Sequence, residues 1–286
     1  MITSEAMAKI GIIGYGIVGK AVGDGFASKK TNQVYWYSRG KGPWTPEEVV
    51  EKSEFLFVCV PTPMFSDGSG IDLSIINNVV KFVAPKIKGT KKILTIKSTV
   101  VPGTTAGLAK KYPGVNFAMN PEFLTEKNAP KDFLKPDRTV IGVMTPAIGK
   151  RLANLYQNLY GKKTKIFVTD TQTAEMVKYM CNAYLATKVI FANEMYDFAA
   201  KLKINYNKVL EMVAADPRIG SAHLKVTKER GFGGKCFPKD MVAFLGLARK
   251  LKVDMSVINT VWAKNLKIRR VKDWETIKGA VNHKQK

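Results

Sequence analysis

The sequence predicts an α/β protein of two domains, a doubly wound parallel sheet followed by an all-helical domain. Short apolar segments alternate with helical ones over residues 9–170, which is typical of a parallel sheet covered by helices. A glycine cluster directly follows the first of these segments. From residue 173 to about 202 a helical pattern continues without glycine or proline, and such a helix spans roughly 45 Å.

The first domain is predicted from β-rich segments separated by helical ones. The expected strands cover residues 9–14, 34–37, 55–60, 93–96, 115–119 and 139–143, and the pattern changes after residues 167–170. Helices are expected from the glycine cluster to about residue 27 and over 73–85. Thr45, Pro46 and Glu48 form a capping box with proline at the first helical position, so another helix begins there.

The second domain is predicted to be helical throughout. After the long segment, helical patterns cover residues 206–215, 239–251 and 256–274, and a glycine-rich loop separates the first two. A helix as long as 173–202 leaves the first domain or links it to a second. We therefore expect a boundary near residue 170, with a sheet domain over 1–170 and a helical domain over 171–286.

Composition excludes several classes of protein. The 286 residues are 45% hydrophobic, yet no apolar run reaches about 18 residues, so we expect no membrane span. The odd number of cysteines, Cys59, Cys181 and Cys236, favours reduced thiols in the cytoplasm over a disulfide framework. The two histidines, His223 and His283, have no zinc-ligand spacing, so no metal site is expected.

The charge is strongly positive, with 46 Lys and Arg residues against 23 Asp and Glu, a net +23. Such a balance suggests a nucleic-acid partner. The lysines, however, are scattered along the chain, and no aromatic-basic motif accompanies them, so the sequence disfavours that role. A basic surface also attracts small anions such as dinucleotides and sugar nucleotides.

The glycine cluster predicts a dinucleotide site. Gly14, Gly16 and Gly19 form a G-x-G-x-x-G pattern between a strand and a helix, where backbone and helix N-terminus approach a pyrophosphate. The acidic residue expected about 20 positions later for the ribose is missing. Ser38 and Arg39 stand at the end of the second strand instead, so both NAD, with Ser38 at the ribose, and NADP remain open.

Polar residues follow other expected strands at the edge where ligands bind. Pro61 and Thr62 follow the third strand, and Thr99 follows the fourth, where its hydroxyl would either place a water or cap the helix near residue 104. Glu122 and Glu126 follow the fifth strand, four residues apart and on one face if the segment is helical. They are candidates for a base, or an ordinary solvated helix start.

The long helix carries a second pair, Lys178 and Asn182, on a stripe with Leu185 and Val189. A cation and an amide donor suit a developing oxyanion if the pair is buried. The alternative is a pair that faces solvent.

The loop at residues 231–240 predicts a sulfur nucleophile. Its glycines allow tight folding, and Lys235 and Lys239 flank Cys236 closely enough to lower the thiol pKa from its ordinary value of about 8.5. Asp240 places a carboxylate within reach. The alternative is a buried cysteine in a glycine turn.

Taken together, these motifs resemble the UDP-glucose 6-dehydrogenase branch of the UDP-glucose/GDP-mannose dehydrogenase family. Eight motifs occur in the family's order and cover nearly all of the chain. They are Gly-Tyr-Gly-Ile-Val-Gly, Val-Pro-Thr-Pro, Lys-Ser-Thr, Pro-Glu-Phe-Leu, Pro-Asp-Arg, Lys178-Tyr179 with Asn182, Asp-Pro-Arg-Ile-Gly and Gly-Phe-Gly-Gly-Lys-Cys-Phe-Pro-Lys-Asp.

The resemblance implies a four-electron oxidation of a sugar C6 alcohol by two NAD, through a thiohemiacetal and a thioester on Cys236. The implied catalytic residues are Cys236, Lys178, Asn182, Asp240, Thr99 and Glu122. The implied cofactor residues are Gly14, Tyr15, Gly16, Ile17, Val18, Gly19, Ser38, Arg39, Pro61, Thr62, Thr99, Glu126 and Lys239. The implied substrate residues are Glu122, Phe123, Leu124, Lys178, Asn182, Arg218, Lys225, Gly231, Phe232 and Gly233.

The resemblance also implies a UDP-sugar substrate and a homodimer through the long helix, in which Arg218 reaches the neighbouring subunit. The family's third, nucleotide-binding domain is expected to be absent, because the chain stops soon after Trp274. The alternatives are oxidation of another sugar nucleotide, such as GDP-mannose or a UDP-N-acetyl sugar, and a cofactor-binding subunit without catalysis.

Overall fold

The computed structural model describes residues 7–282, so His283 lies outside the described residues. The chain forms two compact units: unit 1 is Met1–Thr62 with Leu73–Lys178, and unit 2 is Pro63–Asp72 with Tyr179–Lys286. The domain boundary near residue 170 stays a prediction, because a compact unit need not coincide with an independently folding domain.

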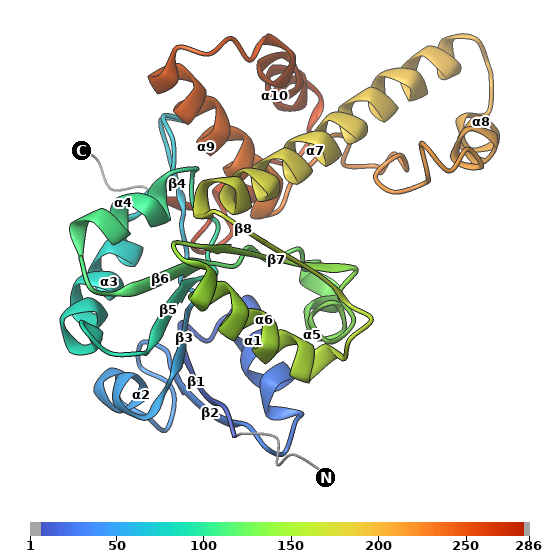
Figure 1. Ribbon diagram of the computed structural model, residues 1–286. Helices are drawn as coiled ribbons and strands as arrows, with labels where there is room; N and C mark the ends of the chain where they lie inside the picture. The colour runs from blue at the N-terminus through green and yellow to red at the C-terminus, as the bar shows by residue number, and fades with distance from the viewer. Residues whose placement is uncertain (1–6, 283–286) are drawn as a thin grey trace. The chain divides into compact units, whose positions relative to one another are not determined.

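Unit 1 contains a seven-stranded sheet in the order β2-β1-β3-β5-β6-β7-β8 (Figure 1). Its strands are β1 Lys9–Ile13, β2 Gln33–Tyr37, β3 Phe55–Val58, β5 Ile93–Ile96, β6 Asn116–Met119, β7 Arg138–Val143 and β8 Lys165–Thr169. Every neighbouring pair is parallel except β6 and β7. The predicted doubly wound α/β fold is therefore confirmed, with one antiparallel pair that the sequence pattern did not reveal.

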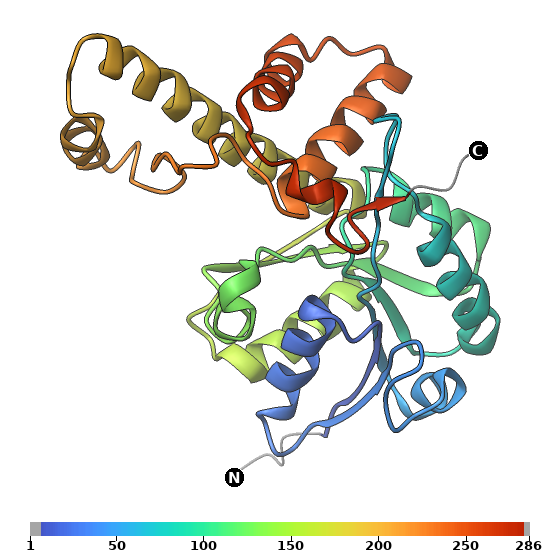
Figure 2. The same cartoon turned by 180° about the vertical axis from the view of Figure 1, so that it is seen from behind.

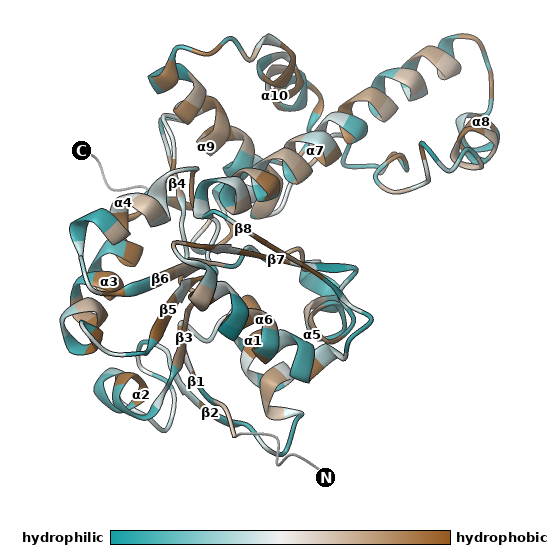
Figure 3. Cartoon of the chain, in the orientation of Figure 1, coloured by the Kyte–Doolittle hydropathy of each residue, from teal (hydrophilic) through white to brown (hydrophobic). Residues whose placement is uncertain are grey.

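Helices cover both faces of this sheet. One layer consists of α1 Ile17–Ala27, α5 Ala129–Leu134 and α6 Pro146–Tyr160, and the other of α2 Pro46–Lys52, α3 Ser74–Ile87 and α4 Thr104–Lys111. The strands between them are largely hydrophobic (Figure 3), as expected for a sheet buried on both faces. The predicted capping box is confirmed at α2, where Thr45 Oγ1 accepts from the Glu48 N–H at 3.2 Å.

Unit 2 is mainly helical. Helix α7, Thr171–Lys201, begins in unit 1 and continues into unit 2. The remaining elements are α8 Tyr206–Ala214, α9 Cys236–Leu251, α10 Ser256–Ile268, the 3₁₀ helix η2 Asp273–Glu275, and the strands β4 Met64–Phe65 and β9 Val281–Asn282. Figure 2 shows the red C-terminal segment of unit 2, where β9 pairs with β4.

Two helix ends differ from the prediction. Helix α9 begins at Cys236 rather than at residue 239, because Pro238 occupies the first turn, where a missing N–H costs nothing. Helix α10 ends at Ile268 rather than at 274, because the chain becomes extended at Arg269. The earlier start of α9 brings Cys236 into the first helical turn.

Within unit 1, a buried carboxylate ties the first turns of α7 to the start of α4. Glu175 is fully buried, and its two oxygens accept from the N–H groups of Gly103 (2.6 Å) and Thr105 (2.8 Å). Burial outweighs these hydrogen bonds and raises the pKa of Glu175 above its usual range. The carboxylate thus satisfies two N–H donors that a helix start leaves without partners in the helix.

We predict that Glu175→Ala lowers the free energy of unfolding by about 1–3 kcal/mol, because both N–H groups lose their acceptor. Glu175→Gln costs less, since the amide oxygen still accepts one bond. Urea unfolding followed by circular dichroism measures both. The control is Glu51→Ala at an exposed position of α2, expected within about 0.5 kcal/mol of wild type. Equal stability of Glu175→Ala and Glu51→Ala contradicts the assigned role.

Candidate functional site

The glycine cluster forms an open cradle at the N-terminus of α1. Gly14 has a φ of +94°, and a Cβ there would lie 2.8 Å from the Cys59 carbonyl oxygen. A Cβ on Gly19 would lie 1.9 Å from the Gly14 carbonyl oxygen, so this glycine permits the close packing of helix and strand. Gly16 precedes α1, and a Cβ added to it would have no heavy atom within 4 Å. The first turn of α1 carries no acidic residue, so this helix end suits an anion.

The residues around the cradle are fixed by an aromatic stack. The Tyr15 ring stacks on Trp36 of β2 at 4.1 Å, and its hydroxyl donates to Asp24 at 2.6 Å. Ile17 is exposed and Val18 half-buried in the first turn of α1. At the end of β2, Ser38 is half-buried and Arg39 exposed. The stack thus shapes one side of the cradle and leaves Arg39 accessible.

Two segments that follow β3 and β5 meet at the same edge of the sheet. The buried Thr62 donates its hydroxyl to the Thr99 carbonyl oxygen at 3.0 Å, while Pro61 is exposed. Thr99 itself is half-buried. The capping alternative for Thr99 is wrong, because α4 begins after Gly103 in a left-handed conformation and has no side-chain cap.

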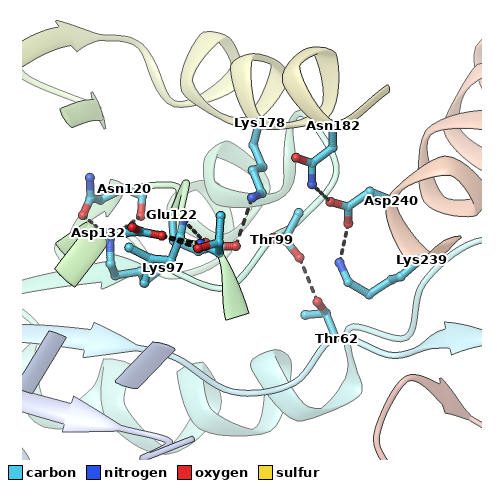
Figure 4. A network of polar contacts seen from close by, with 12 residues as sticks. Thr62, Lys97, Thr99, Asn120, Glu122, Asp132, Lys178, Asn182, Lys239 and Asp240 are labelled. Atoms are coloured by element: carbon cyan, nitrogen blue, oxygen red, sulfur yellow. Dashed lines mark hydrogen bonds and ion pairs between the residues drawn. The ribbon is translucent and has the colours of Figure 1, made fainter. Parts of the chain in front are cut away.

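A buried ion pair joins the segment that follows β6 to α7. Lys178 Nζ lies 3.0 Å from Glu122 Oε1, and the two side chains are 5% and 9% exposed (Figure 4). Glu122 Oε2 also accepts from the Leu124 N–H at 2.7 Å. Burial raises the pKa of Glu122, but Lys178, this N–H and Lys97 together hold it below its usual range. The alternative in which Lys178 faces solvent is therefore wrong.

The two glutamates of this segment do not share a helix face, contrary to the prediction. Residues 120–125 are not helical, and Glu126 begins the 3₁₀ helix η1, Glu126–Asn128. Glu122 is buried and Glu126 exposed, so their surroundings differ completely.

Beside Glu122, unit 1 contains a cavity of about 270 Å³. Lys97, part of the Lys-Ser-Thr motif but given no role from the sequence, lines it and donates to Asn120 Oδ1 at 2.8 Å. Burial lowers the pKa of Lys97 to about 8. Phe123 and Leu124 also line the cavity, and the Arg138 guanidinium lies 4.3 Å from the centre of the Phe123 ring. Two cations therefore contact the ring next to Glu122, since Lys178 Nζ lies 5.7 Å from the centre of the same ring.

In unit 2, the first two turns of α9 carry the sulfur and a buried carboxylate. Cys236 is exposed at the first position of α9, so the alternative of a buried cysteine is wrong. A helix N-terminus favours the thiolate form of such a cysteine. Asp240, only 2% exposed, accepts from Asn182 Nδ2 of α7 at 2.5 Å and pairs with Lys239 at 2.5 Å (Figure 4). Asn182 is likewise buried and does not face solvent.

The other expected substrate residues of unit 2 differ in exposure. Arg218 is 87% exposed and pairs with Asp216 at 2.6 Å, and Lys225 is exposed. Phe232 is buried between Gly231 and Gly233, and its N–H donates to Asn265 at 2.7 Å. Asn265 was not singled out from the sequence, although a polar residue within an apolar helix face was the available signal.

Two features are absent from residues 7–282. They contain no helix with the length and hydrophobicity needed to cross a bilayer. They also contain no group of three or more His, Cys, Asp and Glu side chains arranged to hold a metal ion.

Comparison with known sequences finds two matching family profiles. Residues 44–160 match the "UDP-glucose/GDP-mannose dehydrogenase family, NAD binding domain", and residues 172–267 match the central domain of the same family. The chain is 38% identical over 214 residues to UDP-glucose 6-dehydrogenase of Rickettsia prowazekii, which covers 73% of this chain and 48% of that protein. It is 34% identical over 230 residues to GDP-mannose 6-dehydrogenase of Pseudomonas syringae pv. tomato, covering 76% and 52%.

Among solved structures, a UDP-glucose dehydrogenase from Pyrobaculum islandicum is similar, with a TM-score of 0.83 and 31% identity. The similarity covers 93% of this chain and 70% of that one. The chain spans about half the length of the curated relatives it matches.

The lowered pKa of Glu122 predicts a pH-dependent stability. The ion pair contributes its full share of the free energy of unfolding at pH values above 4.5, the ordinary pKa of a glutamate. This contribution is lost as the pH falls through the lower pKa that Glu122 has in the folded chain. At pH 7, Glu122→Gln is expected to lose about 3 kcal/mol, because Lys178 stays buried without its counter-charge. Urea unfolding at several pH values measures the difference from wild type, which should shrink below pH 4.5.

The matched control is Glu126→Gln, which removes the same charge at an exposed position of the same segment. It should follow the wild-type profile. The assigned ion pair is contradicted if the stability lost in Glu122→Gln is the same at every pH from 7 to well below 4.5. It is also contradicted if adding Lys178→Met to Glu122→Gln recovers none of the lost stability.

Proposed function

Because this chain belongs to the UDP-glucose/GDP-mannose dehydrogenase family, we propose that it oxidises the C6 alcohol of UDP-glucose to a carboxylate with NAD as the oxidant. One observation carries this proposal. Cys236 is exposed in the first turn of α9, and Asp240 follows one turn later as a buried carboxylate held by Asn182 and Lys239.

The cradle of unit 1 fits a dinucleotide. Gly16 leaves open space beside the N-terminus of α1, where backbone N–H groups and the helix dipole favour a pyrophosphate. Tyr15, Ile17 and Val18 would line the cofactor, with Ser38 at the ribose and Pro61, Thr62, Thr99, Glu126 and Lys239 toward the reactive ring. When bound, NAD supplies the hydride acceptor, and two NAD molecules in turn take the two hydrides that C6 loses.

In the proposed reaction, Cys236 acts on the aldehyde stage of the substrate. Its thiolate adds to C6, the C–S bond forms, and the carbonyl oxygen takes a proton to give a thiohemiacetal. Loss of a hydride from C6 and of the hydroxyl proton leaves a thioester on the sulfur. Water then attacks C6, the C–S bond breaks, and the sugar carboxylate leaves Cys236 as a thiol.

The buried polar groups supply the charges for these steps. Lys178 would stabilise the oxyanion that forms at C6, and Asn182 would add a hydrogen bond to it. Glu122 and Thr99 would orient the water that hydrolyses the thioester, and Asp240 would exchange protons with it. The proposal is supported by the fact that these five residues, together with Cys236, are those expected from the family's motifs.

The substrate class is a nucleotide sugar, whose phosphates suit the exposed cations Arg218 and Lys225. Phe123, Leu124, Gly231, Phe232 and Gly233 would contact the sugar through backbone and ring edges. UDP-glucose is favoured because the Rickettsia relative of that activity shares 38% identity. GDP-mannose is the second candidate, because the Pseudomonas relative shares 34%.

Two further properties belong to the proposal. Arg39, exposed beside Ser38, could pair with a 2′-phosphate, so NADP is the alternative cofactor. A cytoplasmic location suits a reaction that needs Cys236 as a thiol, because the cytoplasm keeps thiols reduced.

We also propose a homodimer formed through α7. Large apolar side chains recur along one face of the helix at spacings of three, four and seven residues, and each is at least 40% exposed. They are Met180, Tyr184, Phe191, Met195 and Phe198. A contiguous exposed apolar stripe of this kind is typical of an interaction surface.

For the activity, we predict that the purified chain with UDP-glucose and NAD forms two reduced cofactors per carboxylate, followed by absorbance and product mass. Cys236→Ser should lower turnover more than about 100-fold, since a serine hydroxyl is not ionised. Cys181→Ser, a matched change on α7, should stay within about twofold of wild type. Bound NAD without turnover on UDP-glucose, GDP-mannose or UDP-N-acetyl sugars supports a non-catalytic subunit instead.

For the dimer, we predict that Tyr184→Glu combined with Phe198→Glu gives a monomer, because four charges would face one another across the interface. Light scattering after size-exclusion chromatography measures the mass. The control is Val257→Glu, an equally exposed apolar position on α10, which should leave the dimer intact. A wild-type monomer at micromolar concentration overturns the assignment.

A further inference from the structure

The glycine loop before Cys236 is held by side chains rather than by its own backbone. Within unit 2, the Gly231 N–H donates to Asn193 Oδ1 (3.2 Å), and the Gly234 N–H to both oxygens of Asp273 (3.2 Å each). Phe232 exchanges two bonds with Asn265, which accepts from its N–H (2.7 Å) and donates to its carbonyl (3.0 Å). Three successive anchors therefore fix the loop up to two residues before the sulfur.

The last anchor comes from the C-terminal segment, residues 269–282. Arg269 Nη2 lies 3.2 Å from Asp273 Oδ2, and Arg269 Nη1 donates to the Arg230 carbonyl at 3.0 Å. A Cβ on Gly233 would lie 2.2 Å from Asp273 Oδ1 and 2.4 Å from Arg269 Nη2. The pair thus packs directly on the loop backbone, and a side chain at residue 233 would require Asp273 and Arg269 to move.

The same segment also contacts α9 itself. Trp274, next to Asp273, is 3% exposed and belongs to a buried cluster with Val242 of α9, Met64 and Ala280. Beyond it, β9 pairs with β4, and Asn282 donates to Asp72 at 2.7 Å. The segment therefore reaches the loop on one side of Cys236 and the helix on the other.

We propose that Asp273, supported by Arg269, is a positioning residue for Cys236. It holds the Gly234 N–H and so sets where the first turn of α9 begins. The inference rests on the proposed function, because the position of Cys236 affects catalysis only if its sulfur reacts with the substrate. Asp273 acts only through the loop.

The physical need for such a clamp follows from the glycines. Gly231 and Gly234 both have positive φ, at +48° and +72°, and glycine restricts its own backbone less than any other residue. A nucleophile must stay within a few tenths of an ångström of its productive position, and misplacement by about 1 Å costs about 100-fold in rate. Holding the loop by Asp273 removes the freedom that its glycines introduce.

The test uses the full chain and two readouts. Asp273→Ala should lower kcat at least about tenfold while the KM for NAD changes less than about twofold. The rate of Cys236 alkylation by iodoacetamide at pH 7, followed by mass spectrometry, should fall about two- to fivefold, because a frayed first turn favours the thiolate less. If Asp273 acted only as a nearby negative charge, its removal would favour the thiolate and speed alkylation. The direction of the rate change therefore distinguishes positioning from a charge effect.

Asp273→Asn keeps one acceptor for Gly234 and should retain at least roughly half of the alkylation rate. Glu275→Gln removes the same charge at an exposed position of the same 3₁₀ helix and should behave as wild type. If Asp273→Ala does not fold, Arg269→Lys replaces it, with a smaller loss in both readouts. Unchanged or faster alkylation overturns the proposal. Because alkylation needs no substrate, it decides the question even if wild type shows no turnover.

Discussion

The structure depends on polar side chains that α7 buries. Glu175, Lys178, Asn182 and Asn193 all lie on one face of this helix and are at most 7% exposed. A buried polar group costs free energy unless it is paired, so each demands a partner at a fixed place. The partners are the start of α4, Glu122, Asp240 and the glycine loop, each reached by a different turn. The opposite face carries the exposed apolar stripe.

The buried polar positions explain how one helix holds several separate segments of the chain. Apolar contacts are not directional, whereas a carboxylate or an amide accepts or donates only along certain lines. Position along α7 therefore determines which loop each side chain holds. Lys178 and Asn182 are proposed to act on the substrate, but their observed partners also fix the rotamers in which they would do so.

Much of the fold was predictable because the responsible signals are local. The glycine cluster, the capping box at Thr45 and the apolar strands each depend on a few neighbouring residues, and their elements lie where expected. The antiparallel pairing of β6 and β7 was not predictable, because strand direction depends on the path of the whole chain. The β4–β9 pair joins residues far apart in the sequence and has no local signal. Proline gave an ambiguous signal at Pro121 and Pro238, because a first helical turn tolerates proline but does not require it.

The least predictable residues were those that support the proposed nucleophile. Cys236 and the glycines around it form a recognisable motif, but glycine leaves that loop without side chains to hold it. The constraint must then come from elsewhere in the chain. It comes from Asn193, Asn265 and Asp273, which lie far from the motif in the sequence and follow no pattern that would connect them with it. A glycine-rich motif thus marks where chemistry is expected. The residues that make its geometry reproducible have to be found from the contacts of the folded chain.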